Sequence, residues 1–371
     1  QNIGAGRPGV AYQARQLGLA FNAVLGVIMS LFLSLGAGTI LSGVGVADAL
    51  MQPAKTYLQI VGGFCILNAL IPICSSYLRA FGFSKEPLYA SIIGNVINFC
   101  LNAFSLFVLH KGVAGVATAT VISRIINLVI VVLLGAVLVK AKQHPERESN
   151  RAVMGQIIRI GLPSACETAI YNVSMTLVIR FLNQMDAQGL NVTARSYTMQ
   201  ITNFSYCVGA ALAQANAIMT GWHIGAKEYD ACDRGTKKAA VIGVIVAVIL
   251  ETVFTLCSGW IMQLFSKDPQ MVSLVGKLLA IDIVLEIGRV TNLVYGQALK
   301  TSGDAVFPVV MGACFMILCS VGGTYLFGIR LGLLAVGAYI GMTGDECVRA
   351  VGMYLRWKSG KWKEKGLVKS R

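Results

Sequence analysis

The chain consists largely of long apolar runs, each about the length that a helix needs to cross a bilayer. About ten such runs are separated by clusters of Gly, Pro and charged residues. They lie at roughly residues 16–40, 57–79, 87–109, 113–139, 162–182, 192–219, 239–262, 272–299, 306–328 and 332–355. Only helices and closed barrels satisfy their backbone hydrogen bonds inside lipid, and these runs are too long and too uniformly apolar for barrel strands. The sequence therefore predicts an all-α integral membrane protein.

The composition agrees with this class and excludes several others. Of the 371 residues, 56% are hydrophobic and only 13% are charged, whereas soluble domains have about 25% charged residues. A net charge of +14 would suggest nucleic-acid binding in a soluble protein. Here the basic residues gather in alternate loops, so we expect no nucleic-acid partner. The ten cysteines show no metal-ligand spacing, which indicates neither a zinc site nor a disulfide framework.

The distribution of basic residues predicts the orientation in the membrane. The loops that are richer in Lys and Arg lie around residues 7–15, 79–85, 140–159, 227–238 and 300, and the basic tail 356–371 belongs to the same set. By the positive-inside rule, these segments and the C-terminus are cytoplasmic. We expect a multi-pass protein of the plasma membrane, which in a bacterium is the inner membrane. We also expect it to act as a monomer in contact with lipid.

An internal repeat divides the chain into two halves. Ile3-Gly4-Ala5 recurs as Ile224-Gly225-Ala226, an offset of 221 residues (225 − 4). The same offset relates Leu78 to Leu299 and Pro87 to Pro308, so it is carried across four of the predicted helices. Because about two predicted helices precede the matched region in the second half, we expect two further helices before Gln1 and about twelve in all. The predicted domains are an N-terminal lobe at 1–139, a cytoplasmic linker at 140–160, a C-terminal lobe at 161–355 and a tail at 356–371.

One apolar run carries charges at a spacing that suggests a site. Asp282, Glu286 and Arg289 share one face of a helix, with Asn292 on its flank. Ionisable groups at membrane depth are costly unless paired or facing a polar cavity, and they mark functional sites by default. The alternative is a Glu286–Arg289 salt bridge that serves packing alone. The offset of 221 places uncharged residues at the matching positions of the first half, which favours a functional role for these charges. We expect Asp282 to be the more exposed of the two acids.

A second candidate group follows Pro163. Glu167, Tyr171 and Asn172 lie near the predicted start of a helix, where a buried glutamate could carry a proton, bind sodium or attract a cationic substrate. The alternative is an acid that caps the helix start. Further polar positions are secondary candidates for a cavity lining or for helix-to-helix hydrogen bonds. They are Asn95, Asn98, Gln200, Asn203 and Tyr206. Glu251 stands alone in its run and has no predicted role.

The two halves, the Gly-Ala loops and the segment Leu299-Lys300-Thr301-Ser302-Gly303-Asp304 resemble the multidrug and toxic compound extrusion (MATE) transporters. Gly161-Leu162-Pro163-Ser164 and the pair Asp345-Glu346 add to this resemblance. It implies a two-lobed bundle with six helices per lobe, and a secondary active antiporter. Such a protein exports cationic or amphipathic drugs by alternating access, in exchange for sodium ions or protons. The acids correspond by helix rather than by position, since the seventh-helix acid of one branch of the family falls here at Tyr171.

Other functions are less well supported by the sequence. A lipid-linked saccharide flippase or polysaccharide exporter of the same superfamily would need several basic groups in its cavity, and the candidates are Arg180, Arg195 and Arg289. An intramembrane enzyme would need a nucleophile with a base, or metal ligands, and the three histidines all fall in predicted loops. We expect no catalytic activity, no cofactor and no metal beyond a sodium site at Glu167 or Glu286.

Overall fold

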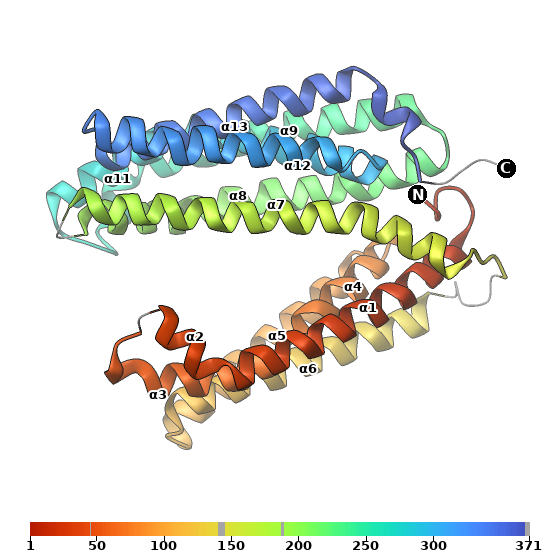
Figure 1. Cartoon of the computed structure of the whole chain (residues 1–371), viewed down its shortest axis with the longest axis horizontal. Coiled ribbons are helices and arrows are strands. Elements are labelled where there is room, and N and C mark those ends of the chain that lie inside the picture. Colours follow the sequence, from red (N-terminus) through yellow and green to blue (C-terminus); the bar gives the residue numbers. More distant parts are fainter. Residues whose placement is uncertain (45, 140–144, 187–188, 368–371) are drawn as a thin grey trace. The chain divides into compact units, whose positions relative to one another are not determined.

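The computed structural model describes residues 1–44, 46–139, 145–186 and 189–367. Every regular element in these ranges is a helix, which confirms the predicted all-α class (Figure 1). The chain forms two compact units. One comprises Arg7–Ile157 with Asn2, and the other comprises Ile158–Arg371 with Gln1 and Ile3–Gly6.

The first unit holds the N-terminal helices. They are α1 (Pro8–Leu35), α2 (Ala37–Val44), α3 (Asp48–Tyr57), the π-helix η1 (Leu58–Gly62), α4 (Ile66–Ala80), α5 (Lys85–Ala103), the π-helix η2 (Phe104–Val108) and α6 (Gly112–Leu138). The predicted run 57–79 is a bent pair of helices instead of a single straight one. Its segments Asp48–Gly62 and Ile66–Ala80 meet at 41°, where a π-turn interrupts the regular hydrogen bonding. Cys74, Leu78 and Val131 belong to the core of this unit.

The second unit contains longer helices. They are α7 (Asn150–Met185), whose first residues belong to the other unit, α8 (Leu190–Gly225), α9 (Tyr229–Leu256), α10 (Ser258–Met262), α11 (Pro269–Ser302), α12 (Val306–Phe315), the π-helices η4 (Met316–Val321) and η5 (Thr324–Arg330), α13 (Leu334–Lys358) and the 3₁₀ helix η6 (Lys361–Glu364). Helix α11 packs against α8, α9 and α13. Many of its apolar residues, among them Val275, Leu279 and Val290, are fully buried, so α11 forms the centre of this unit.

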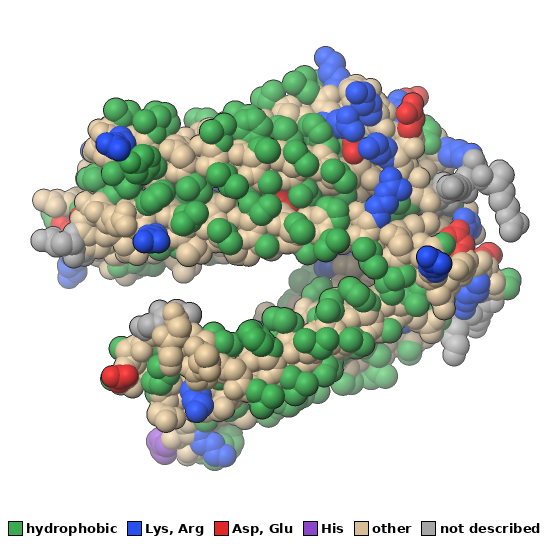
Figure 2. Space-filling model, in the orientation of Figure 1, with side chains coloured by type: hydrophobic (Ala, Val, Ile, Leu, Met, Phe, Trp, Pro, Cys, Tyr) green, Lys and Arg blue, Asp and Glu red, His purple; other side chains and the backbone are tan. Residues whose placement is uncertain are grey.

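The described helices are suited to a bilayer. Five are long and apolar enough to cross it, or six if the bent pair is one span. They are Pro8–Leu35, Lys85–Val108, Gly112–Leu138, Tyr229–Leu256 and Val306–Arg330. Hydrophobic side chains spread along the helices, while Lys and Arg side chains gather mostly toward the helix ends (Figure 2). In water such apolar surface would drive aggregation, whereas lipid solvates it.

The boundary between the two units falls between Ile157 and Ile158, inside the predicted linker at 140–160, and α7 begins within that segment at Asn150. Residues 140–144 of that linker lie outside the described residues. Pro163 therefore lies inside α7, although the sequence suggests that it starts a helix. Glu167 is correspondingly well inside the helix, so its interpretation as a cap at the helix start is wrong.

The predicted tail at 356–371 contacts the second unit as far as Leu367, whose backbone N–H donates to Gln1 Oε1 at 2.8 Å. Residues 368–371 lie outside the described ranges. Trp357 and Trp362 stack with their ring centroids 4.1 Å apart. Arg356 Nε and Lys365 Nζ lie 2.7 and 3.2 Å from the carboxylate of Asp304, which follows α11. Burial acts to raise the pKa of Asp304, but the hydrogen bonds from Arg356 and Lys365 hold that pKa below its ordinary value.

The two Gly-Ala loops of the repeat meet within the second unit. A Cβ on Gly4 would lie 2.0 Å from the carbonyl oxygen of Trp222, and a Cβ on Gly225 would lie 2.0 Å from that of Gln1. Gln1 and Trp222 are themselves separated by the offset of 221 (222 − 1). The two contacts are therefore reciprocal, and each requires a residue without a side chain.

Candidate functional site

Helix α11 brings its charged face into the interior of the second unit. Arg289 Nη1 donates a hydrogen bond to Glu286 Oε1, which is the ion pair that the i,i+3 spacing predicts. Glu286 is fully buried and Asp282 is 2% exposed. Asp282 is the more exposed of the two acids, as predicted, because it lines a cavity that Glu286 does not reach, although both side chains are buried.

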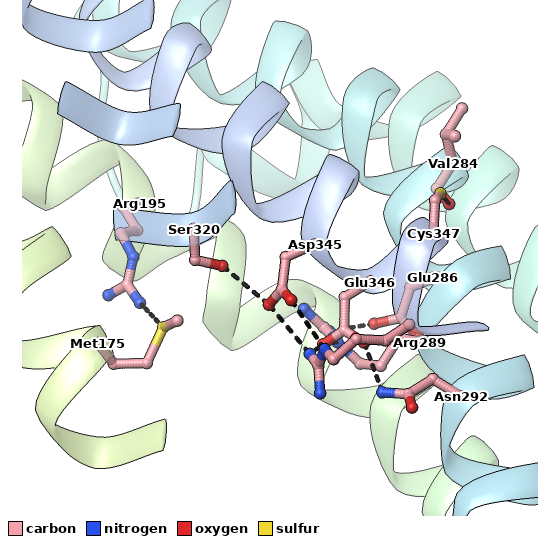
Figure 3. A network of polar contacts seen from close by, with 11 residues as sticks. Met175, Arg195, Val284, Glu286, Arg289, Asn292, Ser320, Asp345, Glu346 and Cys347 are labelled. Atoms are coloured by element: carbon pink, nitrogen blue, oxygen red, sulfur yellow. Dashed lines mark hydrogen bonds and ion pairs between the residues drawn. The ribbon is translucent and has the colours of Figure 1, made fainter. Parts of the chain in front are cut away.

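Helix α13 supplies the partners of this face (Figure 3). Glu346 accepts a hydrogen bond from Asn292 Nδ2 at 3.0 Å, and its Oε1 lies 3.8 Å from Arg289 Nε. The two helices can approach so closely because Gly288 has no side chain. A Cβ there would lie 2.9 Å from the backbone nitrogen of Cys347. The glycine thus allows charges on α11 and α13 to form one network.

The network continues along α13 to η4. Arg349 Nε donates to Asp345 Oδ1 at 2.8 Å, and Arg349 Nη2 lies 2.9 Å from Glu346 Oε1. Ser320 Oγ donates to Asp345 Oδ2 at 2.9 Å. Asp345, Glu346 and Arg349 also line cavities, so these buried charges are placed where a ligand could reach them.

A first cavity of about 220 Å³ opens beside this network. Its charged lining consists of Asp282, Asp345, Glu346, Arg195 and Arg289. Its other lining groups include three tyrosines and three methionines. They are Tyr171, Tyr206, Tyr339, Met175, Met199 and Met342. Aromatic rings and thioethers can pack against varied apolar ligands and favour cations over their faces.

A second cavity of about 510 Å³ shares Tyr171, Tyr206, Arg289 and Glu346 with the first. The charged groups that line only this second cavity are Glu167 on α7, Lys300 in the last turn of α11 and Arg349 on α13. Glu167 Oε2 lies 2.5 Å from Lys300 Nζ. Lys300 is therefore part of the polar interior, although the sequence suggests that it belongs to a cytoplasmic loop. The four shared residues connect both cavities to one set of charges.

Most of the predicted site residues meet here. Glu167, Tyr171, Asn172, Asp282, Arg289, Asn292, Asn203 and Tyr206 line one or both cavities. Glu286 does not line either cavity, and it acts on them through Arg289. Gln200 is exposed and is not among the described residues that line the two cavities.

Asn95 and Asn98 belong to the first unit. Asn98 Nδ2 lies 3.3 Å from Ser123 Oγ on α6, and Asn98 Oδ1 accepts from Asn102 Nδ2 at 3.1 Å. Asn95 is exposed. Of the two interpretations of this polar stripe, helix-to-helix hydrogen bonding describes Asn98.

Sequence reasoning missed Glu346, Lys300 and Glu251 as members of the polar interior. Glu346 directly follows Asp345, but adjacent residues point in different directions on a helix, so its link to Arg289 requires the packing of α13 on α11. Glu251 on α9 is fully buried, and one of its carboxylate oxygens lies within 4.8 Å of oxygens of Asp282 and Glu286. Its isolation in the sequence was the available signal, since a lone acid in an apolar run is expensive without a partner.

These features define a multi-pass helical membrane protein whose C-terminal unit has a charged interior with two cavities. A family model described as MatE matches residues 1–104 and 163–326. The chain therefore belongs to the MATE family of transporters, which confirms the resemblance seen in its sequence.

Individual relatives agree with this assignment. The chain is 32% identical to an uncharacterized transporter, YisQ, from Bacillus subtilis, over 99% of this chain and 82% of that protein. It is 22% identical to a probable multidrug resistance protein, NorM, from Thermotoga maritima, over 91% of this chain and 76% of that protein. A multidrug resistance MATE family transporter solved in an outward-facing conformation has the same fold, with a TM-score of 0.87 and 17% identity. That match covers 98% of this chain and 82% of the solved chain.

Proposed function

We propose that the protein is a secondary active antiporter that exports cationic or amphipathic compounds in exchange for sodium ions or protons. The observation that carries this proposal is the pair of adjoining cavities in the second unit, which combine carboxylates with tyrosines and methionines. An amphipathic cation needs both kinds of group, because its apolar part packs on rings and thioethers while its charge pairs with an acid. The name of the NorM relative, a probable multidrug resistance protein, supports the same substrate class.

The charge balance of the interior favours cations over anions. Three of the four basic groups that line the cavities are paired with carboxylates. Arg289 pairs with Glu286, Lys300 with Glu167, and Arg349 with Asp345 and Glu346. Arg195 contacts the thioether of Met175 at 3.7 Å. A saccharide flippase would need free basic groups for pyrophosphate, and most of these guanidinium and ammonium groups already have partners.

Alternating access gives the ion pairs a role beyond packing. A buried pair is stable only while both partners remain in place, so a ligand or ion that takes one partner changes the energy of the whole arrangement. Glu286 and Arg289 are suited to this exchange, because Arg289 also reaches toward Glu346 on another helix. We expect the pair to separate in another state of the transport cycle.

The first test replaces Glu286 with Gln. Export of a fluorescent lipophilic cation should fall to the level of cells that lack the protein, because Arg289 loses its buried partner and the coupling acid is gone. Efflux is measured in a drug-sensitive host, and the amount inserted is measured in isolated membranes. The control is Glu228→Gln, at an acid whose side chain is 59% exposed. Unchanged efflux by Glu286→Gln at normal membrane levels would contradict the site assignment.

The second test replaces Glu167 with Gln. This leaves the Lys300 ammonium without its carboxylate, so the second cavity becomes more positive and repels a cationic substrate. The KM for a cationic compound should rise by about tenfold or more, which corresponds to about 1.4 kcal/mol of lost attraction. Uptake into inverted vesicles at several substrate concentrations measures this change. The double variant Glu167→Gln/Lys300→Met should recover much of the lost affinity, and an equally poor double variant would argue against charge repulsion as the cause.

A further inference from the structure

Arg195 on α8 is the basic side chain of the cavities that has no carboxylate partner among the described residues. Each of Arg289, Lys300 and Arg349 has at least one such partner. Arg195 lines the first cavity, and its Nη2 contacts the thioether sulfur of Met175 at 3.7 Å, which is a weak acceptor. Its Nε is buried and has no hydrogen-bond partner within the described part of the chain. Figure 3 shows this contact apart from the ion-pair network.

The surroundings of Arg195 leave its charge poorly compensated. The residue is only 7% exposed, so its guanidinium loses most of its hydration without gaining an ion pair. Buried charges are nearly always paired, or they face a polar cavity from which a ligand can reach them. A guanidinium offers five N–H donors in a planar fork that matches the two oxygens of a carboxylate. The missing partner is therefore an anionic group that approaches from the cavity.

The other charges of the first cavity limit what this anionic group can be. Its lining contains the acids Asp282, Asp345 and Glu346 beside the bases Arg195 and Arg289, so the acids outnumber the bases. A phosphate with two negative charges would meet three acids and a single unpaired guanidinium, and like charges repel strongly where water is scarce. A carboxylate carries one charge. The charge balance therefore favours a carboxylate over a phosphate.

An acid without an ion pair lies close to Arg195 along the helix axes. Helices α8 and α11 run in the same direction, since α9 and α10 lead from the end of α8 to the start of α11 and α9 packs along both. A Cβ on Gly209 would lie 2.8 Å from Val290 Cγ2, so residues at the same level differ by 81 in number (290 − 209). Asp282 is then level with Ile201, about 9 Å along the axis from Arg195 at 1.5 Å per residue. Asp282 Oδ2 also has no hydrogen-bond partner among the described residues.

We propose that Arg195 binds a carboxylate on the transported compound, so that the first cavity selects amphipathic zwitterions over compounds that are only cationic. The proposal rests on the proposed export function and names the substrate class of its cavity. The carboxylate pairs with Arg195, the apolar body packs on Met199 and Tyr339, and the cationic group faces Asp282. A compound without the carboxylate leaves the guanidinium unpaired in the complex, and sites discriminate strongly against such a ligand.

The test compares two dyes that differ only at one carboxyl group. One is a rhodamine with a free carboxylate, which makes it a zwitterion, and the other is the methyl ester of the same dye, which is a cation. Fluorescence polarisation measures the binding of each dye to the purified full chain in detergent. The wild type should bind the acid at least about tenfold more tightly than the ester, as expected for a charge-assisted pair. Equal affinity, or tighter binding of the ester, overturns the proposal.

Variants at Arg195 assign this preference to its guanidinium. Arg195→Gln should bind the acid about tenfold more weakly than the wild type and the ester no more weakly. Arg195→Lys keeps the charge without the planar fork, so it should retain part of the preference. The control is Arg330→Gln, at an exposed arginine that contacts the hydroxyl of Tyr325, and it should keep the full preference. An equal loss for both dyes in Arg195→Gln would mean that Arg195 only shapes the cavity, and it overturns the proposal.

Thermal unfolding distinguishes ligand binding from a structural role. Because Arg195 has no ion pair among the described residues, Arg195→Gln should unfold within a few degrees of the wild-type temperature. The acid dye should raise the unfolding temperature of the wild type and of Arg195→Lys more than that of Arg195→Gln. A large fall in the unfolding temperature of Arg195→Gln without any dye would assign the residue to the fold and overturn the proposal.

Competing anions identify the group that Arg195 binds. At constant ionic strength, acetate should displace the acid dye from the wild type more effectively than inorganic phosphate or chloride, because it matches the guanidinium fork with a single charge. Displacement by phosphate at lower concentrations than acetate would make the ligand group a phosphate and overturn the assignment. Displacement by chloride as effective as that by acetate would show general anion binding and overturn it too.

The same dyes separate this subsite from the proposed export function. Efflux of the ester by a protein that binds both dyes equally overturns the subsite and leaves the export function intact. Preferential binding of the acid that depends on Arg195, in a protein that exports neither dye, supports the subsite and contradicts the export function.

Discussion

Replacing Arg289 with Met should both abolish export and destabilise the protein. Arg289 is the cation paired with Glu286, so its loss leaves the buried Glu286 carboxylate near Asp282 without a counter-charge, whereas Glu346 keeps its ion pair with Arg349. Removing one partner of a buried ion pair costs about 3–5 kcal/mol. The Arg289 side chain is 24% exposed, so we expect about 3 kcal/mol, at the lower end of that range. Thermal unfolding in detergent measures the loss, and vesicle transport measures the activity.

The matched control is Arg330→Met, because Arg330 is exposed and contacts the hydroxyl of Tyr325 outside the network. It should unfold close to the wild-type temperature. The double variant Arg289→Met/Glu286→Gln removes both charges of the pair, so it should be more stable than Arg289→Met alone. It should nevertheless remain inactive, since the coupling acid is missing. If the stability losses of the two single variants added up fully in the double variant, Arg289 and Glu286 would not be energetically coupled.

The pattern of the sequence was sufficient for the parts that depend on local spacing. Runs of about 20 apolar residues predict spanning helices, and the i,i+3 spacing of Glu286 and Arg289 predicts their ion pair. Both follow from the geometry of a single helix. The structure confirms the ion pair, and five of the described helices, or six with the bent pair, are long and apolar enough to cross a membrane, against ten predicted runs. The prediction failed at Pro163, because a proline inside a long helix gives the same local signal as one at a helix start.

The lining of the cavities cannot be predicted from any single apolar run, because it depends on how the helices pack against one another. Glu346 reaches Arg289 because Gly288 lets α13 lie close to α11, and Lys300 reaches Glu167 across two helices that are far apart in the sequence. Glu251 lies about 30 residues before Asp282, and its role depends on how α9 packs on α11. The sequence predicted that buried charges need partners, but the identity of those partners follows from tertiary packing.

The reciprocal contact of the two Gly-Ala loops leads to the second large effect. Gly225→Ala should destabilise the protein by about 2 kcal/mol or more, because the added methyl group would overlap a backbone atom that cannot move without shifting its segment. Its Cβ would lie 2.0 Å from the carbonyl oxygen of Gln1. Gly4→Ala should act similarly, through the carbonyl of Trp222 at the same distance. Thermal unfolding in detergent and the yield of monodisperse protein measure both losses.

The control for this effect is Gly235→Ala in α9, where nothing lies within 4 Å of the added Cβ. Alanine is the better helix former by up to about 1 kcal/mol, so this variant should match or exceed the wild type in stability. If alanine were poorly tolerated in general, all three variants would be less stable than the wild type. A tight backbone crossing instead lowers the stability of only the variants at Gly4 and Gly225. Because those two glycines are related by the offset of 221, equal losses would also show that the two halves use the same contact reciprocally. Wild-type stability of both variants would instead mean that the loops do not meet in the folded protein, and the repeat would then lose its structural counterpart.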